Sequence, residues 1–212
     1  MINISVQVKS KQRVSDHGEV FTAEREVKAM CDLVADECTN IRSRFLEPAC
    51  GEGNFLAEIL SRKLQQVKQQ YGDKPEDYAL NSIIALCSLY GIDILSDNVR
   101  ICREKLFGIW HSEYISVCSE CPDDLRSTAE YILSVNIVCG DALELKFADD
   151  NQHTTDKDIL FPEWIFNGSS VSRRDYSLYS MVNAPLLAQT PVNEYQPVNY
   201  RRIATNEPIQ SE

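Results

Sequence analysis

Apolar and polar positions follow two different periods along the first two-thirds of the chain. In long stretches the apolar side chains recur three or four residues apart, which predicts helices over roughly 24–34, 54–71, 76–88, 97–109 and 123–134. Thr22 precedes the first of these helices and has the hydroxyl oxygen favoured at an N-cap. Short apolar runs at 44–48, 89–94 and 136–139 separate the helices and predict strands.

Strands that alternate with helices are typical of an α/β fold, in which right-handed crossovers build a parallel sheet. We therefore expect a three-layer α/β sandwich with a mostly parallel sheet.

The pattern weakens after residue 144. Residues 158–166 could form a fourth strand, although Pro162 would disrupt a central one, and Asn167-Gly168 is a turn signal. The segment from Pro185 onward contains four prolines and little apolar periodicity. We therefore expect one domain over 1–184 and a flexible tail over 185–212.

Composition narrows the function classes. The 212 residues suffice for one domain, and no apolar run is long enough to span a membrane. The N-terminus lacks the apolar stretch of a signal peptide, so we expect a cytoplasmic protein whose eight cysteines are reduced. The net charge of −11 opposes strong binding to a phosphate backbone without a partner.

Three acids, Glu47, Asp93 and Asp141, stand at the ends of the predicted strands. Ligands of parallel sheets bind beyond the carboxyl ends of the strands, so a site is expected there. The first strand also runs into a turn containing Gly51 and Gly53, where missing side chains allow a ligand to approach the backbone. Taken singly, Asp93 or Asp141 could equally cap a helix or a loop, so the inference rests on their joint position.

Residues 45–55, FLEPACGEGNF, closely resemble motif I of the S-adenosylmethionine-dependent DNA methyltransferases that modify adenine at N6. Residues 18–22 resemble the preceding motif of that family, residues 90–93 resemble motif II, and residues 139–143 resemble motif III. The four stretches follow the family's order. The resemblance implies a Rossmann-like methyltransferase sandwich, shortened in its C-terminal half, and S-adenosylmethionine as the cofactor.

The resemblance also implies a role for each residue of the cofactor site. Glu47 would face the methionine amino group, Asp93 would accept from both ribose hydroxyls, and Asp141 would accept from the adenine amino group. The remaining positions would line the methionine portion or touch the adenine ring: Phe21, Thr22, Ala49, Gly51, Gly53, Ile94, and either Ala142 or Leu143.

The family's catalytic motif, Asn or Asp followed by Pro-Pro and an aromatic residue, is missing from the chain. The best positional candidates are Phe161, Pro162, Glu163 and Trp164, but a phenylalanine side chain cannot accept a hydrogen bond from the target amine. The catalytic residues are therefore unassigned. About 40 residues follow residue 143 before the predicted tail, which leaves no room for a DNA-reading domain.

Two further patterns have competing interpretations. Cys118 and Cys121 form a single CxxC pair, and a zinc site requires four ligands, so we expect no metal. Arg173 and Arg174 form a compact basic pair that could contact a phosphate or a partner, although a solvated surface pair is the simpler interpretation.

The sequence thus favours the cofactor-binding subunit of a DNA adenine-N6 methyltransferase from a restriction-modification or defence system. A partner subunit would supply the catalytic loop and the DNA-reading domain. Two alternatives remain: a non-catalytic binding protein derived from a methyltransferase, and an inactive remnant.

Overall fold

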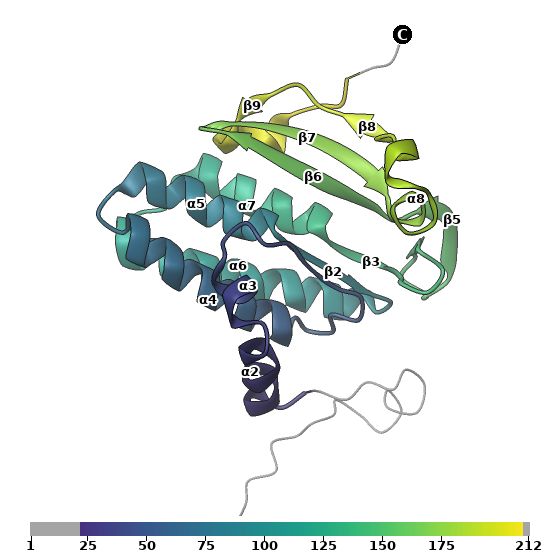
Figure 1. The fold of residues 1–212 in the computed structure, drawn as a ribbon, viewed down its shortest axis with the longest axis horizontal. Helices are drawn as coiled ribbons and strands as arrows, with labels where there is room; N and C mark the ends of the chain where they lie inside the picture. Colours follow the sequence, from purple (N-terminus) through teal and green to yellow (C-terminus); the bar gives the residue numbers. More distant parts are fainter. Residues whose placement is uncertain (1–21, 210–212) are drawn as a thin grey trace, which may run out of the picture.

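The computed structural model describes residues 22–209, and its elements form three layers (Figure 1). Helices α4 and α6 lie on one side, and a hairpin of strands β6 and β7 lies on the other. Between them lies a sheet that contains β2 and β3, together with helices α5 and α7.

The middle layer is a mixed sheet of five strands in the order β1-β2-β3-β4-β5. Strands β1 (Phe45–Glu47), β2 (Leu89–Asp93) and β3 (Ile137–Asp141) are parallel, whereas β4 (Lys146–Ala148) and β5 (Thr154–Asp158) continue the sheet antiparallel. The prediction of an α/β fold with three successive parallel strands is confirmed. The sequence did not predict the two antiparallel strands that extend the sheet.

Four helices make the connections between the parallel strands. Helices α4 (Asn54–Tyr71) and α5 (Pro75–Cys87) join β1 to β2, and α6 (Ser96–Cys118) and α7 (Asp123–Asn136) join β2 to β3. All four helices were predicted, although α6 continues nine residues past its predicted end. Helices α4 and α7 bury one apolar face, as their helical spacing indicates, whereas α5 is buried nearly all round.

A short helical segment precedes the first strand. It consists of α2 (Glu24–Asp32) and α3 (Ala35–Thr39), which contact α4. The predicted N-cap at Thr22 is wrong: the cap position is Ala23, which has no side-chain hydrogen bond to offer. The helix begins one residue later than the threonine hydroxyl requires.

Successive side chains of β2 point alternately toward the two outer layers, as expected for a strand that is buried on both faces. Tyr90 and Ile92 join a cluster with side chains of the β6 layer, while Leu89 packs into the larger helical core. A Cβ atom at Gly91 would lie 3.0 Å from Cys50 Sγ. The turn after β1 therefore packs directly on β2.

A buried lysine ties the beginning of β1 to the beginning of β2. The Lys63 ammonium group donates to the Ser43 carbonyl oxygen and to Ser88 Oγ, and its side chain is fully buried. Burial favours the uncharged form and lowers the pKa of Lys63 to about 8. These bonds fix the start of the strand that leads into the glycine turn.

The expected fourth strand forms, but in a separate antiparallel sheet. Strand β6 (Leu160–Asn167) pairs with β7 (Ser170–Ser177) through the turn predicted at Asn167-Gly168. Strand β6 is at the edge of this sheet, where Pro162 does not remove a bond between two strands. The prediction that residues 158–166 form a strand is confirmed. This strand pairs with β7 and not with the parallel strands.

The segment after residue 185 is not a flexible tail where the structure describes it. Strands β8 (Asn193–Glu194) and β9 (Val198–Asn199) pair with β7. The short helices η1 (Leu186–Ala188) and η2 (Tyr200–Thr205) complete this segment, and α8 (Leu178–Asn183) precedes it.

Two buried side chains hold the end of this segment against α7. Tyr200 and Ile203 are each 3% exposed, and Thr128 Oγ1 donates to the Tyr200 carbonyl oxygen at 3.2 Å. These contacts, together with the pairing of β8 and β9 with β7, dock a proline-rich segment that has no periodic pattern.

Within residues 22–209, the helices include none with both the length and the apolar character needed to cross a membrane.

Candidate functional site

The turn between β1 and α4 has a backbone that only glycine adopts without strain at two positions. Gly51 has φ +51° and Gly53 has φ +79°, both in the left-handed region. A Cβ atom at Gly53 would lie 2.5 Å from Cys102 Sγ, whereas one at Gly51 would meet nothing within 4 Å. Gly53 therefore packs against α6, and Gly51 borders open space.

Asp93 at the end of β2 holds this turn in place. Its Oδ2 atom accepts from the Gly51 amide at 2.8 Å, and its Oδ1 atom accepts from the Leu95 amide at 2.9 Å and from Asn98 Nδ2 at 3.3 Å. A carboxylate offers about four acceptor positions, so these bonds leave room for one more donor. The expectation that Asp93 accepts from both hydroxyls of one ribose stays a prediction.

Glu47 at the end of β1 is half-buried beside the same turn. Burial raises the pKa of its carboxyl group, and the Ala49 amide, 3.4 Å from Glu47 Oε1, opposes that shift. Pairing of Glu47 with Gly91 and of Asp93 with Cys139 brings the ends of the three parallel strands to one edge. The structure thus places Glu47, Asp93 and Asp141 along the same edge of the sheet, as predicted.

Asp141 at the end of β3 binds its own turn. Its Oδ1 atom accepts from the amides of Leu143 at 2.7 Å and Glu144 at 3.0 Å. Leu143 is 95% exposed, although it is a large apolar residue. Ile94 and Ala142 are half-buried. An exposed leucine beside an acceptor is suited to a flat ligand that has both an apolar face and a polar edge.

The segment expected to close over this edge is only partly described. Thr22 is the first described residue and is half-buried, and Phe21 lies outside the described residues. Ala49 is exposed within the glycine turn. The edge as a whole presents carboxylate acceptors and open backbone, which match a ligand rich in hydroxyl and amino donors.

The catalytic candidates do not form a loop beyond a parallel strand. They belong to β6, where Phe161 packs edge-on against Tyr90 with ring centroids 5.2 Å apart. The Tyr90 hydroxyl donates to the Pro162 carbonyl oxygen at 2.8 Å, and Trp164 Nε1 donates to Asn136 Oδ1 at 3.1 Å. Through these contacts residues 161–164 pack β6 against the middle layer.

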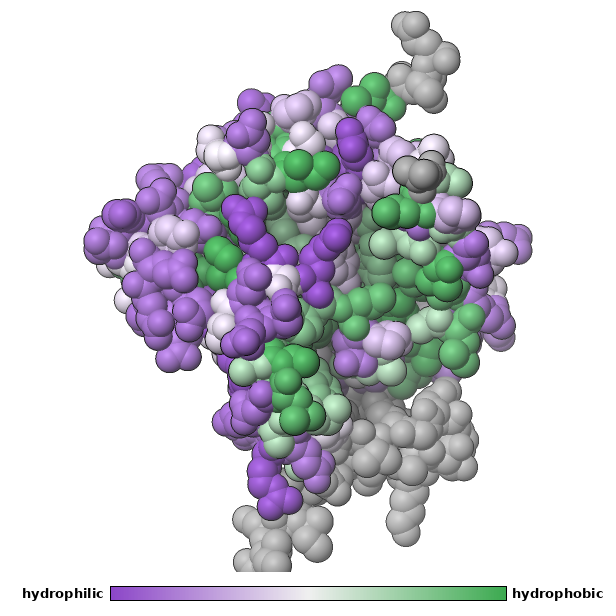
Figure 2. All heavy atoms as spheres, in the orientation of Figure 1, coloured by the Kyte–Doolittle hydropathy of each residue, from purple (hydrophilic) through white to green (hydrophobic). Residues whose placement is uncertain are grey.

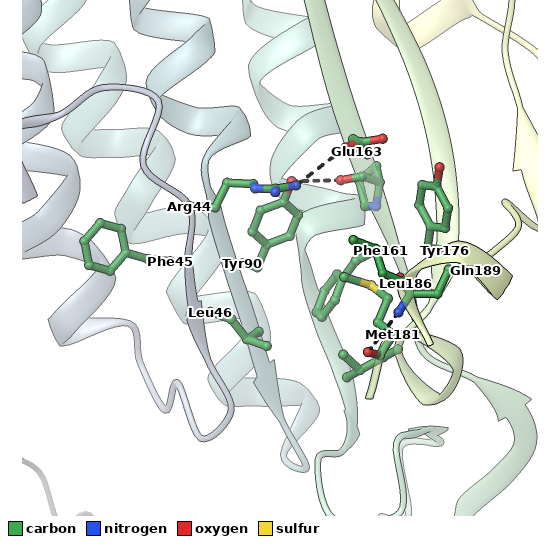
Figure 3. A pocket seen from close by; sticks show the side chains of 12 residues that line it. Arg44, Phe45, Leu46, Tyr90, Phe161, Glu163, Tyr176, Met181, Leu186 and Gln189 are labelled. Atoms are coloured by element: carbon green, nitrogen blue, oxygen red, sulfur yellow. Dashed lines mark hydrogen bonds and ion pairs between the residues drawn. The ribbon is translucent and has the colours of Figure 1, made fainter. Parts of the chain in front are cut away.

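Glu163, the fourth candidate, faces Arg44 across the gap between the layers at 3.8 Å (Figure 3). Both side chains are partly exposed, so the pair contributes little to stability.

The side chain of Arg173 is not solvated, so the interpretation as a solvated surface residue is wrong for it. Its guanidinium group forms two bonds to Asp175, at 2.6 and 2.9 Å, and its side chain is 11% exposed. The aromatic rings of Tyr131, Trp164 and Tyr195 surround it at 5.6, 5.4 and 4.4 Å. Arg173 is thus the centre of a buried cluster.

Sequence reasoning missed Asn98, which is 1% exposed in the first turn of α6 and donates to Asp93. An asparagine five residues after a strand-end aspartate was the available signal. Within residues 22–209, no group of three or more His, Cys, Asp or Glu side chains could hold a metal ion. Cys118 and Cys121 are half-buried free thiols.

Comparisons of the chain with protein-family models, with curated proteins and with solved structures find no match.

The two glycines of the turn should respond differently to alanine. Gly53→Ala is expected to lower the free energy of unfolding by about 2 kcal/mol, because it combines a strained backbone with a clash against Cys102. Gly51→Ala carries a similar backbone strain without the clash and should cost about 1 kcal/mol. Urea unfolding of both variants measures the difference. Equal costs, or no relief of the Gly53→Ala defect by Cys102→Ala, would contradict this packing.

Proposed function

We propose that this chain is the S-adenosylmethionine-binding subunit of a DNA adenine-N6 methyltransferase. The observation that carries the proposal is the single edge along which β1, β2 and β3 place Glu47, Asp93 and Asp141. The glycine turn that resembles motif I opens directly onto this edge.

Each part of the cofactor has a suitable counterpart among the described residues. The half-buried Glu47 would face the methionine ammonium group, where a charge-assisted contact is strongest. The remaining acceptor position of Asp93 would take one ribose hydroxyl. Leu143 and Ile94 would cover the adenine ring, and Asp141 would accept from its amino group. The open space at Gly51 would admit the methionine portion.

A partner subunit would complete the reaction. The target amine must be held by two acceptors in line with the methyl group. Phe161 and Trp164 are committed to packing on Tyr90 and Asn136, so β6 does not offer such a clamp. The net charge of −11 also leaves the reading of DNA to a more basic surface. The subunit would bind DNA through this partner.

Calorimetric titration of the purified chain with S-adenosylmethionine tests the proposal. We expect binding, and we expect Asp93→Ala to weaken it by roughly 1.5–3 kcal/mol, the scale of a hydrogen bond to a charged group. Asp73→Ala removes the same charge from an exposed turn between α4 and α5 and should leave the affinity unchanged.

Because Asp93 also holds the glycine turn, unfolding curves of the variant must accompany the titration. Equal affinity in a folded Asp93→Ala variant would overturn the assignment of this residue. Failure of the unaltered chain to bind the cofactor would overturn the proposal and favour a protein that acts through contacts alone, or an inactive remnant.

A further inference from the structure

Strand β1 has one open edge in the described part of the chain. Among the described strands it pairs only with β2, and it is the first strand in the sheet order. The Phe45 amide donates to the Ser88 carbonyl oxygen at 2.9 Å, so Phe45 directs its backbone groups toward β2. Because directions alternate along a strand, the N–H and C=O of Leu46 point toward the open edge.

An apolar groove of about 340 Å³ lies beside this edge (Figure 3). Leu46 lies on one side of it and Phe161, Met181 and Leu186 lie on the other, while the Arg44–Glu163 ion pair crosses one end. Figure 2 shows apolar side chains gathered in a hollow on this face of the molecule.

The groove leaves large apolar side chains uncovered. Leu46 is 45% exposed, Met181 is 44% exposed and Leu186 is 81% exposed. An open strand edge beside apolar side chains promotes association with other chains, and folded proteins normally cover such an edge. A further strand beside β1, with apolar side chains on the face toward the groove, would cover both the open edge and these side chains.

The chain itself contains a segment with this pattern outside the described residues. Residues 2–8, INISVQV, alternate strictly between apolar and polar side chains. We propose that this segment adds to the open edge of β1 as a sixth strand and places its apolar side chains in the groove. Ile2, Ile4, Val6 and Val8 would face the groove, and Asn3, Ser5 and Gln7 would face solvent.

The length of the intervening chain favours this occupant over a partner. The described chain begins at Thr22 and passes through α2 and α3 directly into β1. The residues between 9 and 22 span up to about 45 Å when extended, which is ample for a return to β1. A tethered segment is also present at a high effective concentration, so it competes well against a free partner. This inference is independent of the proposed cofactor.

Hydrogen exchange at the Leu46 amide tests the proposal. We expect this amide to exchange at least about 10-fold more slowly in the full chain than in a chain that lacks residues 1–9, because the added strand would accept its hydrogen bond. Equal exchange rates would overturn the proposal. Protection that appears only in a dimer, as measured by light scattering, would overturn it in favour of a segment from a second copy.

A matched pair of variants tests the face that the segment presents. Val6→Asp would place a charge in the groove and should lower the melting temperature by roughly 5 °C, whereas Ser5→Asp adds the same charge on the solvent face and should change it by less than about 1 °C. Equal effects of the two variants would contradict the predicted alternation and overturn the proposal.

Discussion

The purified chain alone is expected to transfer no detectable methyl group to unmethylated DNA, although we propose that it binds the methyl donor. The amine of adenine is a poor nucleophile because its lone pair is delocalised into the ring. Two acceptors at the reacting centre would be needed to redirect it. Phe161 cannot accept a hydrogen bond, and the Pro162 carbonyl oxygen already accepts from Tyr90.

Loss of one positioned polar group at a reacting centre typically lowers the rate about 10²–10³-fold. Without an aromatic side chain among residues 161–164 free to stack on the target base, the remaining activity should fall below detection. The measurement is transfer of tritiated methyl groups from S-adenosylmethionine to DNA, with and without the product of the adjacent gene.

Addition of the correct partner is expected to restore transfer, and Asp141→Ala in this chain should then abolish it by emptying the adenine site. Asp73→Ala is the control that should keep the restored activity, because Asp73 lies in an exposed turn and not at the end of a parallel strand. Robust transfer by this chain alone would refute the split arrangement and would show that β6 acts as an unorthodox catalytic element.

Arg173→Met is expected to lower the free energy of unfolding by about 3–5 kcal/mol, the usual cost of breaking one side of a buried ion pair. The substitution leaves Asp175, which is 2% exposed, without its charged partner. It also removes the cation that lies over the rings of Tyr131 and Tyr195. Urea unfolding followed by tryptophan fluorescence measures the change.

Arg174→Met is the matched control, because the neighbouring arginine is exposed and its replacement should cost less than about 0.5 kcal/mol. The double variant Arg173→Met with Asp175→Leu should recover part of the loss, since it leaves no buried charge unpaired. Equal costs for the two arginines would show that the buried cluster does not form in solution.

The part of the fold from β1 to β3 could be predicted because its signals are local. Apolar side chains at helical spacing predict helix α4. The glycine turn at Gly53 marks its beginning, and Pro75, which starts the next helix, marks its end. Once strands and helices alternate, the direction of the crossovers follows from chain chirality. The sequence therefore also placed Glu47, Asp93 and Asp141 at one edge of the sheet.

One partner of those acids, the Gly51 amide, depended on tertiary structure. No spacing rule states that Gly51 donates to Asp93, because the two residues come together only when β1 and β2 pair. The bond from Asn98 to Asp93, by contrast, joins residues five positions apart, so it is a local contact. The number of acceptor positions left for a ligand was therefore not readable from the sequence.

The C-terminal third departs most from expectation because its order comes from long-range contacts. Strand β8 pairs with β7 about 20 residues earlier in the chain, and Tyr200 and Ile203 are held by α7, about 70 residues earlier. Arg173 looked like a surface residue because its sequence neighbours are polar, yet the rings of Tyr131 and Tyr195, from other segments, and of Trp164, its partner across the hairpin, enclose it. Local periodicity determined the α/β core of this protein, whereas the burial of Arg173 and the docking of the last segment were decided only by tertiary packing, since a contact between distant residues leaves no periodic trace in either one's neighbourhood.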